Sequence, residues 1–276
     1  MTGRVSVWIL FLAAVGGCGN PQPFVTPERL DRGLVLVLTG IEGRSPKNRD
    51  IRLGLNDGGV NAAIEVIDWT AGVPGAYLMN LWARERNRTK AEEIVDRIVR
   101  YQMAWPKRPV VLVGHSGGAG IAVWVSEFMP PGRQVEGVIL LAAALSRDYP
   151  LEMALMNSRR GIANFHSLRD WVFLGAGTAV TRTMDGKHGQ AAGRAGFDAP
   201  AATTRPKNYA KLFQIQWSKT MAQTGHYGGH LSSSARGFVS RYVAPLVLAE
   251  RWDTETVDAV RAGGLPAAPA GDPGGR

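Results

Sequence analysis

The chain has 276 residues, of which 45% are hydrophobic, and a formal net charge of +9. This length allows one sizeable α/β domain but not two large ones, and the composition suits a compact enzyme better than a disordered or fibrous chain. The basic residues are scattered, which argues against a nucleic-acid partner, and the single cysteine argues against a zinc site, so we expect neither metal nor cofactor.

The N-terminal residues 1–17 have the features of an export signal. A short basic start precedes an almost wholly apolar run over 5–15, which is too short to span a bilayer permanently. The sequence Val15-Gly16-Gly17-Cys18 resembles the lipobox of bacterial lipoproteins. This resemblance implies cleavage before Cys18, lipidation of its thiol and attachment to a membrane of the cell envelope. An ordinary signal peptide is the alternative.

Residues 18–32 are expected to form a tether, followed by a folded domain over 33–251 and a disordered tail over 262–276. Six aliphatic runs predict buried strands, at 33–38, 62–69, 110–113, 138–141, 162–166 and 212–217. Periodicity and capping residues predict helices between them, at 47–58, 78–86, 89–101 with Thr89 as the cap, from the serine motif described below to Pro130, 151–157 and 235–251.

The alternation of these segments predicts the fold class. Strands that are aliphatic throughout belong in a mostly parallel sheet of about six strands, with helices on both faces. Residues 178–207 are rich in Gly, Ala and Thr and are expected to cross over the sheet without forming a large cap domain. Sites in such sheets lie at the C-terminal ends of the strands.

One such strand end carries the motif Gly114-His115-Ser116-Gly117-Gly118. In a tight turn from strand to helix, the central residue projects clear of the sheet. A Cβ two residues before or after it would collide with the neighbouring backbone, so Gly114 and Gly118 fit this geometry. Ser116 is therefore the candidate nucleophile, at the N-terminus of the helix that follows.

A serine hydroxyl needs a base within hydrogen-bond reach. Of the five histidines, His115 lies inside the turn and should point away from the hydroxyl, His166 is expected to be structural, and His188 has no strand to position it. His226 and His230 both follow the last strand. We favour His230, because glycines flank it on one side and the closing helix starts soon after, and keep His226 as the alternative.

The acid that orients the base should follow a strand between the serine and the histidine. Asp170 comes a few residues after the fifth predicted strand, and its neighbour Trp171 would help to exclude water. Asp148, after the fourth predicted strand, is the competitor. Asp185 is a weaker candidate, because Asp185-Gly186 is typical of a turn.

The elbow motif and the order Ser, Asp, His resemble the α/β-hydrolase family, of the serine esterase and lipase type, over roughly residues 33–250. The resemblance implies an oxyanion hole formed by the backbone amide of Gly117 and one from the loop after the first strand, Ile41 or Gly40. Two departures stand out. The two antiparallel strands that usually open the fold have no room before residue 33, and no long cap insertion is visible unless residues 178–207 serve as one. The oxyanion loop also lacks the His-Gly-Gly-Gly run of one esterase branch.

The expected function is hydrolysis of carboxylic esters, from small molecules or lipids, through an acyl-enzyme, by a protein anchored to the envelope membrane. A thioesterase, an amidase or an acyltransferase would use the same residues. A lipoprotein that keeps the fold as a binding scaffold, without catalysis, is the second hypothesis.

Overall fold

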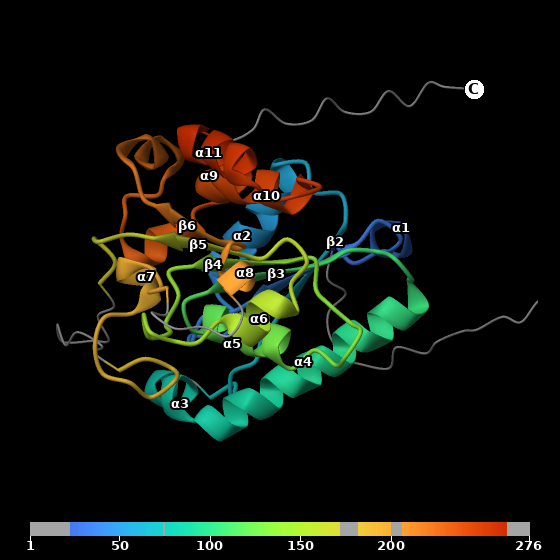
Figure 1. Ribbon diagram of the computed structural model, residues 1–276, viewed down its shortest axis with the longest axis horizontal. Coiled ribbons are helices and arrows are strands. Elements are labelled where there is room, and N and C mark those ends of the chain that lie inside the picture. Colours follow the sequence, from blue (N-terminus) through green and yellow to red (C-terminus); the bar gives the residue numbers. More distant parts are fainter. Residues whose placement is uncertain (1–22, 74, 172–181, 200–205, 264–276) are drawn as a thin grey trace, which may run out of the picture.

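Six parallel strands form the single sheet of the computed structural model, which describes residues 23–73, 75–171, 182–199 and 206–263 (Figure 1). Their order across the sheet is β2-β1-β3-β4-β5-β6. The predicted parallel sheet of about six strands is thereby confirmed. The strands are β1 (Leu34–Leu38), β2 (Ala63–Ile67), β3 (Val110–His115), β4 (Gly137–Leu141), β5 (Ile162–His166) and β6 (Leu212–Gln216).

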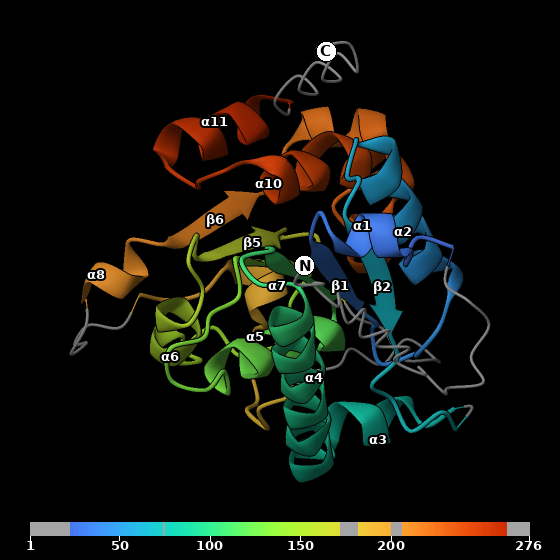
Figure 2. The ribbon, with the colours of Figure 1, turned by 90° about the vertical axis from the view of Figure 1, so that its right-hand side faces the viewer.

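Helices cover both faces of this sheet, as predicted (Figures 1 and 2). They are α1 (Pro27–Leu30), α2 (Pro46–Asp57), α3 (Tyr77–Trp82), α4 (Arg84–Ala104), α5 (Gly117–Glu127), α6 (Glu152–Met156), α7 (Ala192–Ala195), α8 (Pro206–Tyr209), α9 (Arg236–Phe238), α10 (Ala244–Leu248) and α11 (Thr254–Gly263). The described residues also contain two 3₁₀ segments, η1 (Lys219–Thr224) and η2 (His230–Ser234), and a π-helical segment, η3 (Val239–Val243).

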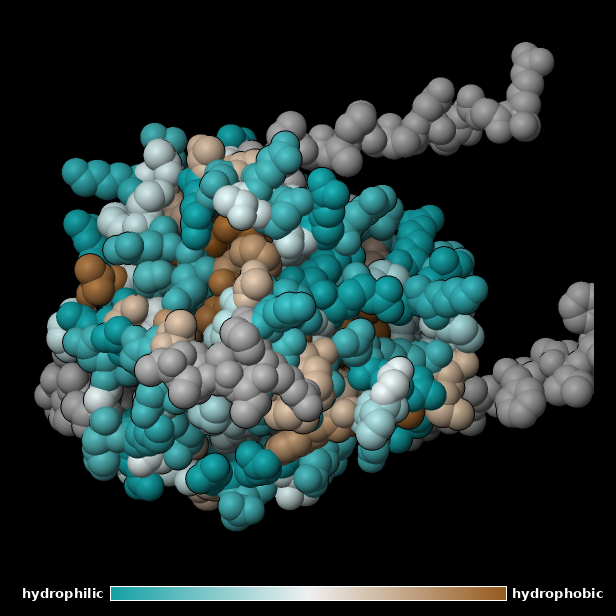
Figure 3. All heavy atoms as spheres, in the orientation of Figure 1, coloured by the Kyte–Doolittle hydropathy of each residue, from teal (hydrophilic) through white to brown (hydrophobic). Residues whose placement is uncertain are grey.

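Two hydrophobic cores lie on opposite faces of the sheet. Successive side chains of a strand point to opposite sides, so Leu34, Leu36 and Leu38 pack with α4 and α5, whereas Val35 and Val37 pack with α2 and the C-terminal helices. All five are essentially inaccessible to solvent. Burial of aliphatic residues on both faces leaves a mainly hydrophilic exterior on the side shown in Figure 3.

The helices before β3 differ from the prediction. We expected Thr89 to cap a helix, but α4 already begins at Arg84, and the Thr89 hydroxyl donates to the carbonyl of Glu85 within the helix. The break comes earlier, at Ala83, which separates α3 from α4. A side-chain contact fixes the corner between α3 and α4. The buried Asn87 side chain donates to the backbone carbonyl of Asn80.

The folded part also extends beyond the expected domain at both ends. Within the expected tether, α1 forms, and the carbonyl of Phe24 accepts a hydrogen bond from the Ile64 amide at 3.0 Å. Beyond residue 251, α11 buries Val257 and Val260 against the sheet. The expected signal over 1–17, Cys18 and residues 264–276 lie outside the described residues. In the described part of the chain, no helix is long and apolar enough to cross a membrane.

Candidate active site

Ser116 occupies a sharp turn between β3 and α5, with φ 56° and ψ −119°. A positive φ is strained for any residue with a Cβ. A Cβ on Gly114 would lie 2.4 Å from the carbonyl oxygen of Gly118, and one on Gly118 would lie 2.2 Å from that of Leu38. The two glycines are thus required where the motif predicted them. The close packing holds the Ser116 side chain at the C-terminal end of β3.

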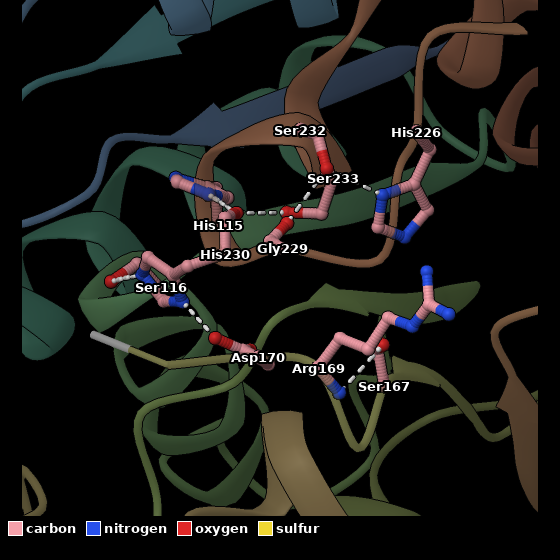
Figure 4. Close-up of polar contacts among 10 residues, drawn as sticks. All are labelled: His115, Ser116, Ser167, Arg169, Asp170, His226, Gly229, His230, Ser232 and Ser233. Atoms are coloured by element: carbon pink, nitrogen blue, oxygen red, sulfur yellow. Dashed lines mark hydrogen bonds and ion pairs between the residues drawn. The ribbon is translucent and has the colours of Figure 1, made fainter. Parts of the chain in front are cut away.

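Three side chains from distant parts of the chain form one series of hydrogen bonds at this turn (Figure 4). The Ser116 Oγ lies 2.8 Å from Nε2 of His230, and Nδ1 of the same ring lies 2.8 Å from Oδ1 of Asp170. With the proton on Nδ1, the ring donates to the carboxylate and accepts from the hydroxyl. All three residues are at least 92% buried.

Two further groups fix the backbone of His230 from behind. The Ser233 hydroxyl donates to the His230 carbonyl at 2.7 Å, and Nε2 of His115 lies 3.2 Å from the same oxygen. Burial lowers the pKa of His115 to about 4, so its ring is neutral and donates one N–H to this carbonyl. His115 therefore contacts the loop that carries His230.

His226, the alternative base, lies elsewhere in the same loop. Its Nδ1 lies 3.0 Å from the Ser232 hydroxyl, which in turn donates to the carbonyl of Gly229. The His226 ring packs against Phe238, with the ring centroids 4.5 Å apart. The structure places His226 in the support of the loop, and His230 at Ser116.

Neither alternative acid lies beside His230. Asp148 is exposed and forms an ion pair with Lys187, with 2.5 Å between Nζ and Oδ2. Asp185 is buried and accepts hydrogen bonds from the amide and the hydroxyl of Ser146, at 3.0 and 2.5 Å. Asp185 thereby ties the turn at residues 182–189 to the loop after β4.

The loop after β1 lies directly against the elbow. A Cβ on Gly117 would come within 2.7 Å of the Ile41 side chain. The side-chain amide of the buried Asn80 donates to the Ile41 carbonyl at 2.9 Å and fixes the loop from the other side. The backbone amides of Ile41 and Gly117 donate to no other described residue. Ile41 lines the pocket at Ser116, whereas Gly40 does not.

A pocket of about 260 Å³ opens at Ser116. Ile41, Leu81 and the three alanines 142–144 contribute to its lining, so much of the lining is apolar. Trp171 and residues within 182–194, which belong to the expected crossing segment, form a further part of the wall. This wall contributes two arginines, Arg182 and Arg194.

Sequence reasoning did not single out the arginines of this wall, or Asn80. The segment 178–207 has no hydrophobic periodicity, and hydrogen bonds to the loop after β4 hold its described part, residues 182–199, in place. The dipeptide Asp185-Gly186 was the available signal that this region contains an ordered turn.

No protein-family model matches the sequence, and no curated protein does either. Among solved structures, lipase B of Aspergillus fumigatus is similar with a TM-score of 0.50 at 12% identity, over 89% of this chain and 60% of the lipase. Esterase PE8 is also similar, with a TM-score of 0.41 at 15% identity, over 72% of this chain and 85% of the esterase. A cutinase-like protein from Cryptococcus sp. has a TM-score of 0.41 at 15% identity, over 85% of this chain and 97% of that protein.

The chain has an α/β-hydrolase fold. The six parallel strands, the helices on both faces and the likeness to lipase B support this assignment. The chain spans 60% of the length of that lipase, and identity this low shows the fold alone. In this α/β-hydrolase fold, the turn with Ser116 lies at the C-terminal end of β3, a central strand, where ligands bind in open parallel sheets.

Proposed function

We propose that the chain is a serine hydrolase that cleaves carboxylic esters. Ser116 is the nucleophile, His230 the base and Asp170 the group that orients the base. The observation that carries this proposal is the unbroken series of hydrogen bonds through these three residues, which ends on the pocket. A hydroxyl becomes a competent nucleophile in such an arrangement because an imidazole can take its proton.

In the first half of the reaction, the Ser116 Oγ attacks the carbonyl carbon of the ester as its proton moves to Nε2 of His230. The negative charge that forms on the carbonyl oxygen is stabilised by the amides of Gly117 and Ile41. Asp170 stabilises the imidazolium by accepting its Nδ1–H. Collapse of the intermediate breaks the ester bond, and His230 gives its proton to the departing alcohol.

In the second half, water replaces the alcohol. His230 takes a proton from this water as its oxygen attacks the acyl group on Ser116. The same two amides stabilise the second oxyanion, and the proton returns to the serine as the acid departs. Apolar walls around the pocket exclude other water, which strengthens each of these polar contacts.

Thioesters and transfer of the acyl group to another alcohol would use the same atoms. A binding scaffold without catalysis is the less economical alternative. The backbone strain at Ser116 costs about 1–3 kcal/mol, and a merely structural turn would gain nothing from it.

A fluorophosphonate probe tests the proposal. We expect wild-type protein to be labelled and Ser116→Ala not to be labelled. His230→Gln should label at least about 10³-fold more slowly, because the hydroxyl loses its base. His226→Gln is the matched control, and should keep its labelling rate within a few fold.

An unlabelled wild type, or equal labelling of Ser116→Ala, would contradict the proposal. If His226→Gln loses labelling while His230→Gln keeps it, the base is assigned to the wrong histidine. Hydrolysis of short-chain and long-chain nitrophenyl esters, measured on the same variants, then compares acyl groups.

We also propose that the protein is anchored at the cell envelope through lipidated Cys18. The support is the apolar run over 5–15, followed by Val15-Gly16-Gly17-Cys18. The enzyme would then act on esters that reach the membrane surface.

A further inference from the structure

Two arginines line the pocket at Ser116 without a carboxylate partner among the described residues. Arg182 and Arg194 both contribute to its wall. The acids of the same region are engaged elsewhere, since Asp148 pairs with Lys187, Asp198 with Arg147, and Asp185 with Ser146. Asp170 also lines the pocket, but it accepts the hydrogen bond from His230.

Each guanidinium group lies over an aromatic ring. The Cζ of Arg194 lies 3.5 Å from the centroid of the Trp171 ring, and the Cζ of Arg182 lies 5.7 Å from that of Trp82. At the distance of Arg194, the ring covers one face of the guanidinium and leaves the N–H groups, which lie in its plane, free to donate. Arg182 uses one of them on the carbonyl of Gly186. For Arg194, Nη1 is buried without a hydrogen-bond partner in the described part of the chain.

The backbone that carries the two arginines is fixed to the sheet. The Met184 amide donates to the carbonyl of Ala144 at 2.9 Å, and the Ala192 amide donates to that of Leu145 at 2.8 Å. A Cβ on Gly193 would lie 2.4 Å from the carbonyl carbon of Ala142, so this segment packs directly on the loop after β4. The wall therefore presents its cations from a defined position.

We propose that this pocket selects esters that carry a negatively charged group, a carboxylate or a phosphate. The inference rests on the proposed function and names its substrate class. A guanidinium binds such anions through paired, charge-assisted hydrogen bonds, which are stronger where water is partly excluded. A neutral ester would leave Nη1 of Arg194 without a partner, whereas an anionic one can pair with both guanidinium groups while its carbonyl lies at Ser116.

Two matched pairs of substrates test this selectivity on the full-length protein. On the acyl side, the mono-nitrophenyl ester of adipic acid is compared with nitrophenyl methyl adipate. On the alcohol side, butyrylglycerol phosphate is compared with monobutyrin. We expect kcat/KM to favour the anionic member of at least one pair by about tenfold or more, mainly through KM. The pair that responds shows which side of the ester carries the charge.

Variants connect the preference to the wall. Arg182→Gln with Arg194→Gln should abolish the preference, so that kcat/KM for the anionic member of the pair falls to that for the neutral member. Arg182→Gln alone, at an exposed position, should reduce it in a chain that still folds, and Arg182→Lys should restore part of it. Arg100→Gln is the control for net charge. It removes an exposed arginine near the C-terminal end of α4 and should not change the preference.

The outcomes separate the two proposals. If the neutral esters are hydrolysed equally well and the arginine variants do not change the ratio, the anionic selectivity is overturned and the hydrolase stands. If no ester is cleaved and the fluorophosphonate does not react, the proposed hydrolase function is wrong. Titration calorimetry then tests separately whether the pocket binds anions. The anion site is supported if wild type binds monomethyl adipate or butyrylglycerol phosphate but not dimethyl adipate, and if the double variant loses this binding. If wild type binds neither anion, the anion site is overturned.

Discussion

Three side chains away from the Ser116 hydroxyl respond to pH in opposite directions. Burial lowers the pKa of His115 and that of His226 to about 4. Burial raises the pKa of Glu127 to about 7, although the Tyr149 hydroxyl donates to its carboxylate at 3.1 Å. Each shift is a contribution to folding free energy that changes with pH.

The histidines and the carboxyl change the free energy of unfolding with pH in opposite directions. The folded histidines titrate below their ordinary value of 6.5, so the unfolded chain binds more protons between about pH 4 and 6.5 and stability rises with pH there. The folded carboxyl titrates above its ordinary 4.5, so its contribution is complete below that pH and is lost as pH rises to about 7. Two histidines outweigh one carboxyl over their shared range.

Substitution of the carboxyl should therefore change the slope. In Glu127→Gln, the free energy of unfolding should rise more steeply between pH 4.5 and 6.5 than in wild type, because the opposing group is gone while an acceptor for Tyr149 remains. Urea denaturation at a series of pH values measures this. Glu92→Gln, at an exposed position of α4, is the control. Parallel curves for Glu127→Gln and wild type would contradict the assignment.

At the scale of elements, α11 belongs to the folded domain. Trp252 precedes α11 and donates to the carbonyl of Leu246, and a Cβ on Gly137 would lie 2.7 Å from its ring. Val257 and Val260 complete the buried face. Burial of a large apolar side chain contributes about 1.5–3 kcal/mol, so this element is expected to contribute about 5 kcal/mol.

A chain that ends at residue 251 should lose that contribution, which is a large part of the stability of an ordinary domain. A chain that ends at Gly263 retains α11 and should unfold within about 1 kcal/mol of the full chain. Urea denaturation of both forms compares them. Equal stability of the shorter form and the full chain would show that α11 only covers a core that is complete without it.

The strands were the predictable elements. Runs such as 34–38 are aliphatic throughout because both faces of the sheet are buried, and each observed strand lies within one or two residues of its prediction at either end. Helix ends were less predictable. Asn87 makes a side-chain contact with Asn80 that has no local signal, and α4 therefore begins at Arg84, five residues before the expected cap at Thr89.

The candidate site divides in the same way. The elbow could be predicted because its glycines are local to Ser116, and Asp170 because it follows a strand. The choice between His226 and His230 depends on the path of a Gly-rich loop, which Ser232 and Ser233 fix through hydrogen bonds to its own backbone. The arginine wall depends on contacts between 182–194 and the loop after β4, and no periodic pattern marks those contacts in the sequence.

At the scale of the whole molecule, an anchor at Cys18 would hold the folded domain close to a membrane. The described fold starts at residue 23, and Phe24 already contacts the core. Five residues at full extension span at most about 18 Å. The chain that starts at Cys18 carries +8, because Arg4 is the only charged residue before it and the whole chain carries +9. Both the short link and the charge favour close contact with an anionic lipid surface.

Expression in a bacterial host with labelled palmitate tests this arrangement. The wild-type chain should incorporate the label, enter the detergent phase on phase separation, and show the mass of a chain that begins with lipidated Cys18. Cys18→Ser should do none of these, and should keep its fluorophosphonate labelling because the thiol takes no part in the reaction. A mature chain without the lipid mass would indicate an ordinary signal peptide. A Cys18→Ser variant that partitions like wild type would show that something other than this lipid holds the protein at the membrane.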